Sequence, residues 1–79
     1  MKLTYDPKCN IAYIRLREKA EQVETLQLSD ELNVDIGSDG KIYGFELLNA
    51  NEQLAADDAK GLTVVNEASG ETSRVKLAV

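Results

Sequence analysis

The residues from Asp35 to Glu46 have the types and spacing of a calcium-binding loop of the EF-hand kind. Asp35, Asp39, Gly40 and Glu46 occupy positions 1, 5, 6 and 12 of that pattern. Position 3 does not fit, because Gly37 offers no side-chain oxygen. The residues before this stretch alternate as in a strand, whereas an EF-hand needs flanking helices. We therefore interpret Asp39-Gly40 as a hairpin turn and not as part of a calcium loop.

Three oxygen-bearing residues, Asn33, Asp35 and Glu46, fall on one face of the hairpin that this turn would close. Oxygen ligands of this kind suit weak binding of a divalent cation. The more ordinary interpretation is a solvated acidic face, because half-exposed antiparallel sheets carry such residues on their wet side. We assign no metal ligands, and keep a small hydrolase or divalent-metal-binding protein on this acidic sheet face as the alternative function.

Nucleophilic catalysis has little support in the sequence. The chain has no His, so a Cys-His or Ser-His pair cannot be assembled within it. Cys9, the single cysteine, lies beside Lys8 in a predicted turn and is interpreted as a bystander. The glycines lack the spacing of a phosphate-binding loop. We therefore assign no catalytic and no cofactor-binding residues, expect no cofactor, and predict that the protein is not an enzyme.

Length and charge exclude further classes. The 79 residues suffice for a single domain, residues 1–79, whose small core gains from dimerisation. Nine basic against fourteen acidic residues give a net charge of −5 without a basic cluster, which argues against nucleic acid as a ligand. No apolar run is long enough to span a membrane and the N-terminus lacks a signal-peptide core. We expect a cytoplasmic protein with no membrane partner.

Alternation of apolar and polar residues predicts strands through the first fifty positions. The first two strands flank a loop at 7–10, so that Asp6 pairs with Ile11. Further strands are predicted at 22–28, 32–36 and 42–48. A two-residue type I′ turn at Asp39-Gly40 would pair Ile36 with Tyr43. It would also place Val34 opposite Phe45 and Leu32 opposite Leu47.

The period changes after residue 48. Asn49 with Glu52 resembles a helix N-cap and its N3 partner, and alanines at helical spacing predict a short helix at about 50–60, with Gly61 after its end. Residues 62–66 and 73–79 are predicted as a C-terminal strand pair. The expected fold class is α+β and mainly antiparallel β: a β-meander of about five strands, one short helix and the strand pair, with scope to curl into a partly closed barrel.

Several strands together resemble a known family. The residues concerned are Tyr5-Asp6, residues 12–16, Glu24-Thr25, Leu28, Val34-Asp35 and residues 39–50. Over about residues 1–50 the sequence resembles the small bacterial family catalogued as domain of unknown function 2283. The resemblance implies a β-rich cytoplasmic bacterial protein, and it supplies no activity or site residues to transfer. Families of this kind are sometimes encoded beside toxin-like partners, which implies a protein-binding role.

Apolar and hot-spot residue types on the outer face suggest an interaction surface. Its candidate residues are Ile11, Tyr13, Arg15, Ile42 and Leu48. The opposite interpretation, that the helix or the C-terminal strands cover them, is equally open. The function predicted from sequence is a non-enzymatic protein-interaction module. It would form a homodimer, through this outer patch or an open sheet edge, or bind another small protein as an antitoxin does.

Overall fold

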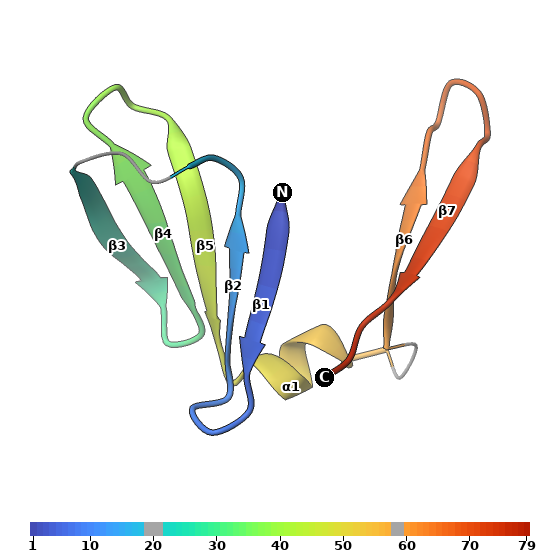
Figure 1. The fold of residues 1–79 in the computed structure, drawn as a ribbon, viewed down its shortest axis with the longest axis horizontal. Coiled ribbons are helices and arrows are strands. Elements are labelled where there is room, and N and C mark those ends of the chain that lie inside the picture. The colour runs from blue at the N-terminus through green and yellow to red at the C-terminus, as the bar shows by residue number, and fades with distance from the viewer. Residues whose placement is uncertain (19–21, 58–59) are drawn as a thin grey trace.

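Two separate β-sheets joined by one short helix make up the fold (Figure 1). The structure is a computed structural model of the chain and describes residues 1–18, 22–57 and 60–79. The elements are β1 (Lys2–Asp6), β2 (Ile11–Arg15), β3 (Val23–Ser29), β4 (Leu32–Gly37), β5 (Ile42–Leu48), α1 (Ala50–Leu54), β6 (Gly61–Val65) and β7 (Thr72–Lys76). The predicted α+β class, dominated by antiparallel strands, is confirmed.

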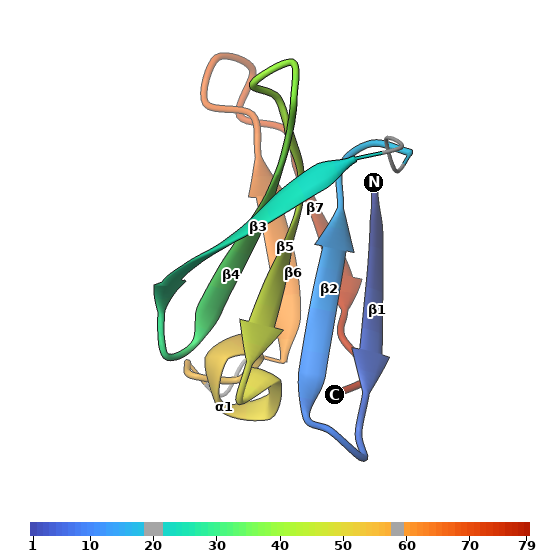
Figure 2. The same cartoon turned by 90° about the vertical axis from the view of Figure 1, so that its left-hand side faces the viewer.

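The larger sheet has five antiparallel strands in the order β1-β2-β5-β4-β3. The β1–β2 hairpin and the β3–β4–β5 meander are each local in sequence, and pairing of β2 with β5 joins them. Figure 2 shows the twist of this sheet, with β1 and β3 as its free edges. The sheet stays open, so it does not curl into a barrel.

The first hairpin has the register that the sequence predicts. Asp6 pairs with Ile11, and Leu3 and Tyr5 lie opposite Ile14 and Ala12. A carboxylate oxygen of Asp6 accepts a hydrogen bond from the backbone N–H of Lys8 at 2.9 Å, which stabilises the turn. The two-residue period therefore sorts these apolar side chains to one face of the sheet.

The turn between β4 and β5 differs from the predicted one. Gly40 has φ 80° while Asp39 is not left-handed, so the type I′ turn is wrong. The Gly40 N–H donates to the Gly37 carbonyl and the Gly37 N–H donates to the Lys41 carbonyl, each at 2.9 Å, which closes a three-residue loop. This loop pairs Ile36 with the first residue of β5, Ile42.

A β-bulge in β5 then restores the predicted register. Asp35 lies opposite Gly44 and Val34 opposite Phe45, which leaves Tyr43 as the extra residue. Because of the bulge, Ile42 and Tyr43 lie on the faces opposite to those predicted. Tyr43 moves to the polar face, and the prediction that it pairs with Ile36 on the apolar face is wrong.

The helix is shorter than predicted and is capped from elsewhere. It ends at Leu54, and the last turn carries no basic residue to favour its continuation. The predicted continuation at 58–59 lies outside the described residues, and Gly61 begins β6 instead of following the helix. Asn49 has φ 52° and makes no side-chain cap; its amide donates to Glu52 at 2.9 Å.

Asn10, in the β1–β2 loop, supplies the missing acceptors at the start of α1. Its backbone carbonyl accepts the Ala50 N–H at 3.0 Å and its side-chain oxygen accepts the Asn51 N–H at 2.9 Å. The Asn10 amide donates in turn to the Asn51 side chain at 2.7 Å. With φ 55°, Asn10 adopts the left-handed conformation that Asn tolerates better than most residues. The loop thereby ties α1 to the five-stranded sheet.

The predicted C-terminal strand pair is confirmed as the hairpin β6–β7, in which Leu62 pairs with Val75 and Val64 with Ser73. It stands apart from the five-stranded sheet beyond α1 (Figure 1). All of its residues except Gly61 are exposed. An isolated two-stranded hairpin is only marginally stable in water.

The core of the chain is very small. Among the described residues, only Ala12, Val34 and Ala50 are buried apolar side chains, and no large side chain is fully buried. Phe45, the single Phe, is only half-buried. No helix in the described part of the chain has the length and apolar character needed to cross a membrane.

We expect Asn10→Gly to lower the free energy of unfolding by about 1–2 kcal/mol, because it removes the acceptor of the Asn51 N–H and the amide contacts while glycine still permits φ 55°. Urea unfolding followed by circular dichroism measures the change. The matched control is Lys8→Gly in the same loop, where no described side-chain hydrogen bond is lost. Equal effects of the two substitutions would contradict the capping role.

Candidate functional site

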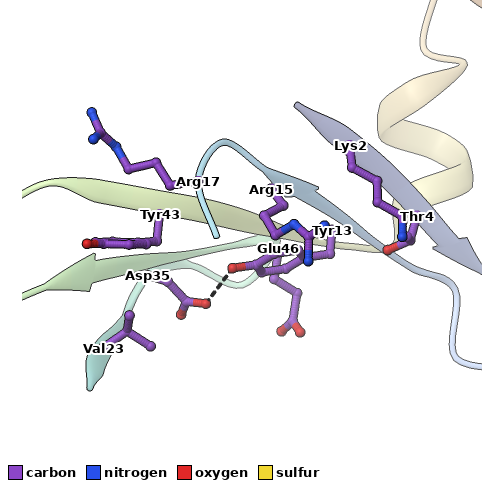
Figure 3. A pocket seen from close by; sticks show the side chains of 9 residues that line it. All are labelled: Lys2, Thr4, Tyr13, Arg15, Arg17, Val23, Asp35, Tyr43 and Glu46. Carbon is purple, nitrogen blue, oxygen red and sulfur yellow. Dashed lines mark hydrogen bonds between the residues drawn. The ribbon is translucent and has the colours of Figure 1, made fainter. Parts of the chain in front are cut away.

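A shallow depression of about 410 Å³ lies on the polar face of the five-stranded sheet (Figure 3). Its lining residues come from all five strands, so residues far apart in sequence meet there. Its lining residues are Lys2, Thr4, Tyr13, Arg15, Arg17, Val23, Asp35, Tyr43 and Glu46. The depression contains both cations and carboxylates around two tyrosine rings, so it is an open polar surface rather than a closed pocket.

Tyr13 is held in place by a glycine and a carboxylate. A Cβ added at Gly44 would come within 2.5 Å of the Tyr13 hydroxyl oxygen, so the tyrosine lies directly over that glycine. The hydroxyl donates to one carboxylate oxygen of Asp35 at 2.7 Å, and Thr25 donates to the other at 2.6 Å. Asp35 therefore connects β2, β3 and β4 across the polar face.

Tyr43 repeats this arrangement near the turn. A Cβ added at Gly37 would lie 2.4 Å from the Tyr43 ring, so a side chain at that position would displace it. The Tyr43 hydroxyl donates to Asp39 at 3.2 Å. The bulge in β5 is what brings this ring to the polar face beside Tyr13. Packing of an aromatic ring over a strand glycine compensates for the missing side chain.

Charges on the depression are divided between two sides. Lys2, Arg15 and Arg17 come from β1, β2 and the residues after β2, whereas Asp35 and Glu46 come from β4 and β5. Arg15 forms an ion pair with exposed Glu18 at 3.6 Å, which contributes little in water. Glu46 accepts a hydrogen bond from the Asn33 amide at 3.0 Å.

Burial and neighbouring carboxylates raise the pKa values of both phenols. Burial, followed by the hydrogen bond to Asp35 and its negative charge, raises the pKa of Tyr13 from 10.0 to about 12. Burial and the hydrogen bond to Asp39 also raise the pKa of Tyr43. Both hydroxyls therefore stay protonated at neutral pH and act as hydrogen-bond donors, which suits binding better than proton abstraction.

The structure brings together four of the five residues predicted as an interaction surface. Ile11 pairs with Leu48, and Tyr13 and Arg15 follow on the same face of β2. Ile42 does not share this face, and the prediction that it does is wrong. It lies opposite Ile36 because the three-residue turn shifts the start of β5 by one position.

The three oxygen-bearing residues that suggested divalent-metal binding do share a face, since Asn33 pairs with Glu46 next to Asp35. Both oxygens of Asp35 and one of Glu46 already accept hydrogen bonds from side chains. Within the described residues, no group of three or more Asp, Glu, Cys and His side chains is placed to hold a metal ion. Cys9 is exposed, and the charge of Asp6 raises the pKa of its thiol, which reduces its reactivity.

The structure adds a second candidate surface, which the sequence analysis treated as core. We call it the apolar face; it is the opposite face of the same sheet. Register assigns to it the apolar residues Leu3, Tyr5, Ala12, Ile14, Leu26, Leu32, Val34, Ile36, Ile42, Phe45 and Leu47, with one charged residue, Glu24, opposite Ile36 on the edge strand β3. Only Ala12 and Val34 of this set are buried, and Leu3 and Leu26 are 37% and 36% exposed. The sequence did contain a sign that this face would be exposed. The predicted helix has only about ten residues, which is too few to cover a sheet of five strands.

We expect Tyr13→Phe to lower the free energy of unfolding by about 1–2 kcal/mol, because Asp35 loses a donor at a half-buried position. Tyr43→Phe is the matched control. Its hydroxyl bonds the exposed Asp39, so its loss should cost less than about 0.5 kcal/mol. Urea unfolding at pH 7 measures both. An equal cost for the two variants would contradict the special role of the Asp35 bond.

The raised pKa of Tyr13 predicts a dependence of stability on alkaline pH. The phenol ionises more easily in the unfolded chain, at about 10, than in the folded one, at about 12. Its contribution is fully present below pH 10 and is lost as pH rises through 12. The difference in unfolding free energy between the wild type and Tyr13→Phe should therefore shrink over this range. A difference that stays constant to pH 12 would contradict the assignment.

Comparison with known proteins identifies a family. Residues 2–51 match the family model described as a protein of unknown function (DUF2283), and this segment spans β1 to β5 and the start of α1. No curated protein and no solved structure matches the chain. The matched segment covers more than half of the sequence and includes both faces of the five-stranded sheet. The chain is therefore a member of the DUF2283 family, whose function is uncharacterised.

Proposed function

We propose that this protein is a non-enzymatic protein-interaction module whose working surface is the apolar face of the five-stranded sheet. The observation that carries the proposal is the exposure of that face. Its central Phe45 and the neighbouring Ile14 and Leu47 are only half-buried, and Leu3 and Leu26 are exposed at the edge strands. Large contiguous apolar surfaces on small proteins mark sites of protein contact.

The register supports a single continuous surface. Leu3, Ile14, Phe45, Val34 and Leu26 form one row across all five strands, each paired with the next. This row extends across the whole sheet and contains no charged residue. Burying it would contribute a favourable free energy of roughly 25 cal/mol per Å² of apolar area removed from water. Shielding of this row by a protein partner is therefore strongly favourable.

The partner is a protein and not a small molecule, because the surface is broad and the depression on the opposite face is shallow. An antitoxin-like role, in which the module covers an apolar surface of a second small protein, fits this geometry. The polar face, with Tyr13 and Arg15, would remain exposed in such a complex. The bacterial cytoplasm is the compartment that the sequence analysis predicts for it.

The test compares two neighbours on the edge strand β3. Leu26 lies opposite Val34 on the apolar face, whereas Gln27 lies opposite Asn33 on the polar face. The full chain, Leu26→Lys and Gln27→Lys are each immobilised and used to capture proteins from native lysate, and captured proteins are then purified for titration calorimetry. We expect Leu26→Lys to raise the Kd at least tenfold, because the complex would bury a charge, with less than a twofold change for Gln27→Lys.

Two results would contradict the proposal. One is a full chain that binds no protein, neither a second copy nor another component of the lysate. The other is a partner whose Kd is the same for Leu26→Lys and the wild type. Circular dichroism of each variant confirms that the strands persist, so that a lost interaction is not mistaken for unfolding.

A further inference from the structure

The chain has two apolar surfaces without a cover. The first is the apolar face of the five-stranded sheet. The second lies on the β6–β7 hairpin, where Leu62, Val64 and Val75 share one side according to the register. These three are 46%, 52% and 56% exposed. We call this second surface the hairpin face.

The accessible surface area of the chain is larger than that of a compact monomer of the same length. The chain exposes 5972 Å², whereas a compact monomer of this length is expected to expose roughly 4,700 Å². The radius of gyration is 14.1 Å, against an expected value of about 11.6 Å for a compact domain of this size. The hairpin stands apart from the larger sheet, and this separation increases both values (Figure 1).

The excess of roughly 1,200 Å² per chain matches the area that a permanent dimer buries on each partner. A standard transient interface buries only about 800 Å² on each side. The excess is thus of the size that one further copy of the chain would bury. A two-fold dimer also presents each surface twice, so the sheet of one copy and the hairpin of the other meet in two equivalent contacts.

We propose that two copies of this chain form a reciprocal dimer, in which the hairpin face of each copy packs on the apolar face of the other. This inference rests on the proposed function, because it names the occupant of the same apolar face. The contact is a sheet-on-sheet packing, in which apolar side chains of both faces interdigitate at a spacing of about 10 Å.

The opposite side of the hairpin is suited to remain in water. Thr63 pairs with Arg74 and Gly61 with Lys76 on that side. The Arg74 guanidinium lies directly over Gly61, where an added Cβ would come within 2.9 Å of it. The hairpin is therefore amphipathic, with one mainly apolar side and one side that carries Arg74 and Lys76 together with Thr63, Thr72 and Val65. A hairpin of this pattern forms the outer layer of a sandwich.

The first experiment measures the solution mass of the full chain by sedimentation equilibrium. We expect a dimer in the wild type. Val64→Glu, on the hairpin face, should shift it to monomer by raising the dissociation constant at least tenfold. The matched control Thr63→Glu, on the adjacent outward side opposite Arg74, should stay dimeric. A monomeric wild type, or a Val64→Glu variant that dimerises as well as Thr63→Glu, would overturn the inference.

The second experiment locates the contact and does not depend on folding of a destabilised variant. In a Cys9→Ser background, chains carrying Val64→Cys are mixed with chains carrying Leu26→Cys and treated with a short bismaleimide. We expect a crosslinked heterodimer of these two chains. Replacing Val64→Cys by Thr63→Cys should reduce its yield at least fivefold. Equal yields from the two hairpin positions would overturn the reciprocal arrangement.

A chain that carries both Val64→Cys and Leu26→Cys distinguishes a dimer from a monomer whose hairpin folds back onto its own sheet. Crosslinks between chains support the dimer, and crosslinks within a chain at monomer mass overturn it. The proposed function fails separately. If the wild type is monomeric but binds another protein in a Leu26-dependent way, the inference is wrong and the interaction module stands. If it binds nothing, both are wrong.

Discussion

Pairing of β2 with β5 is the interaction on which the rest of the structure depends. The β1–β2 hairpin and the β3–β4–β5 meander each form from local contacts, and only the ladder from Ile11–Leu48 to Arg15–Gly44 joins them into one sheet. The same ladder brings Tyr13 over Gly44 and carries the β1–β2 loop to the start of α1. Both faces of the sheet, polar and apolar, exist because this long-range pairing fixes their register.

Much of the sheet could be predicted from sequence, because strand positions and hairpin registers depend on residues close together in the chain. Alternation of apolar and polar residues predicted the strands, and the four-residue loop at 7–10 predicted the register of the first hairpin. The second turn could not be predicted in detail, since Asp39-Gly40 suits both a two-residue turn and the last positions of a three-residue loop. The choice depends on the bulge at Tyr43, whose ring needs the space above Gly37. That requirement is tertiary and leaves no local pattern.

The candidate site was predicted in part for the same reason. Tyr13 and Arg15 could be placed on the polar face from the period of β2, but Tyr43 and Ile42 exchange faces at the bulge. The helix was overestimated because alanine spacing extends beyond Leu54, whereas the cap comes from Asn10, distant in sequence. Apolar residues assigned to a core turned out to face an open side. The sequence pattern predicts which face of a strand is apolar, but it does not predict whether that face is covered by the same chain.

The scarcity of buried side chains has a consequence for the lifetime of the protein in a cell. In the described part of the chain, only Ala12, Val34 and Ala50 have buried apolar side chains. A single copy therefore has little packing to oppose the local unfolding that exposes the backbone to proteases. In the proposed complex, association would supply the missing burial, and the folding free energy would then depend on concentration. Freshly made copies in excess of their binding partner would be degraded first. The abundance of the protein would then follow the abundance of its complex, with no dedicated regulator.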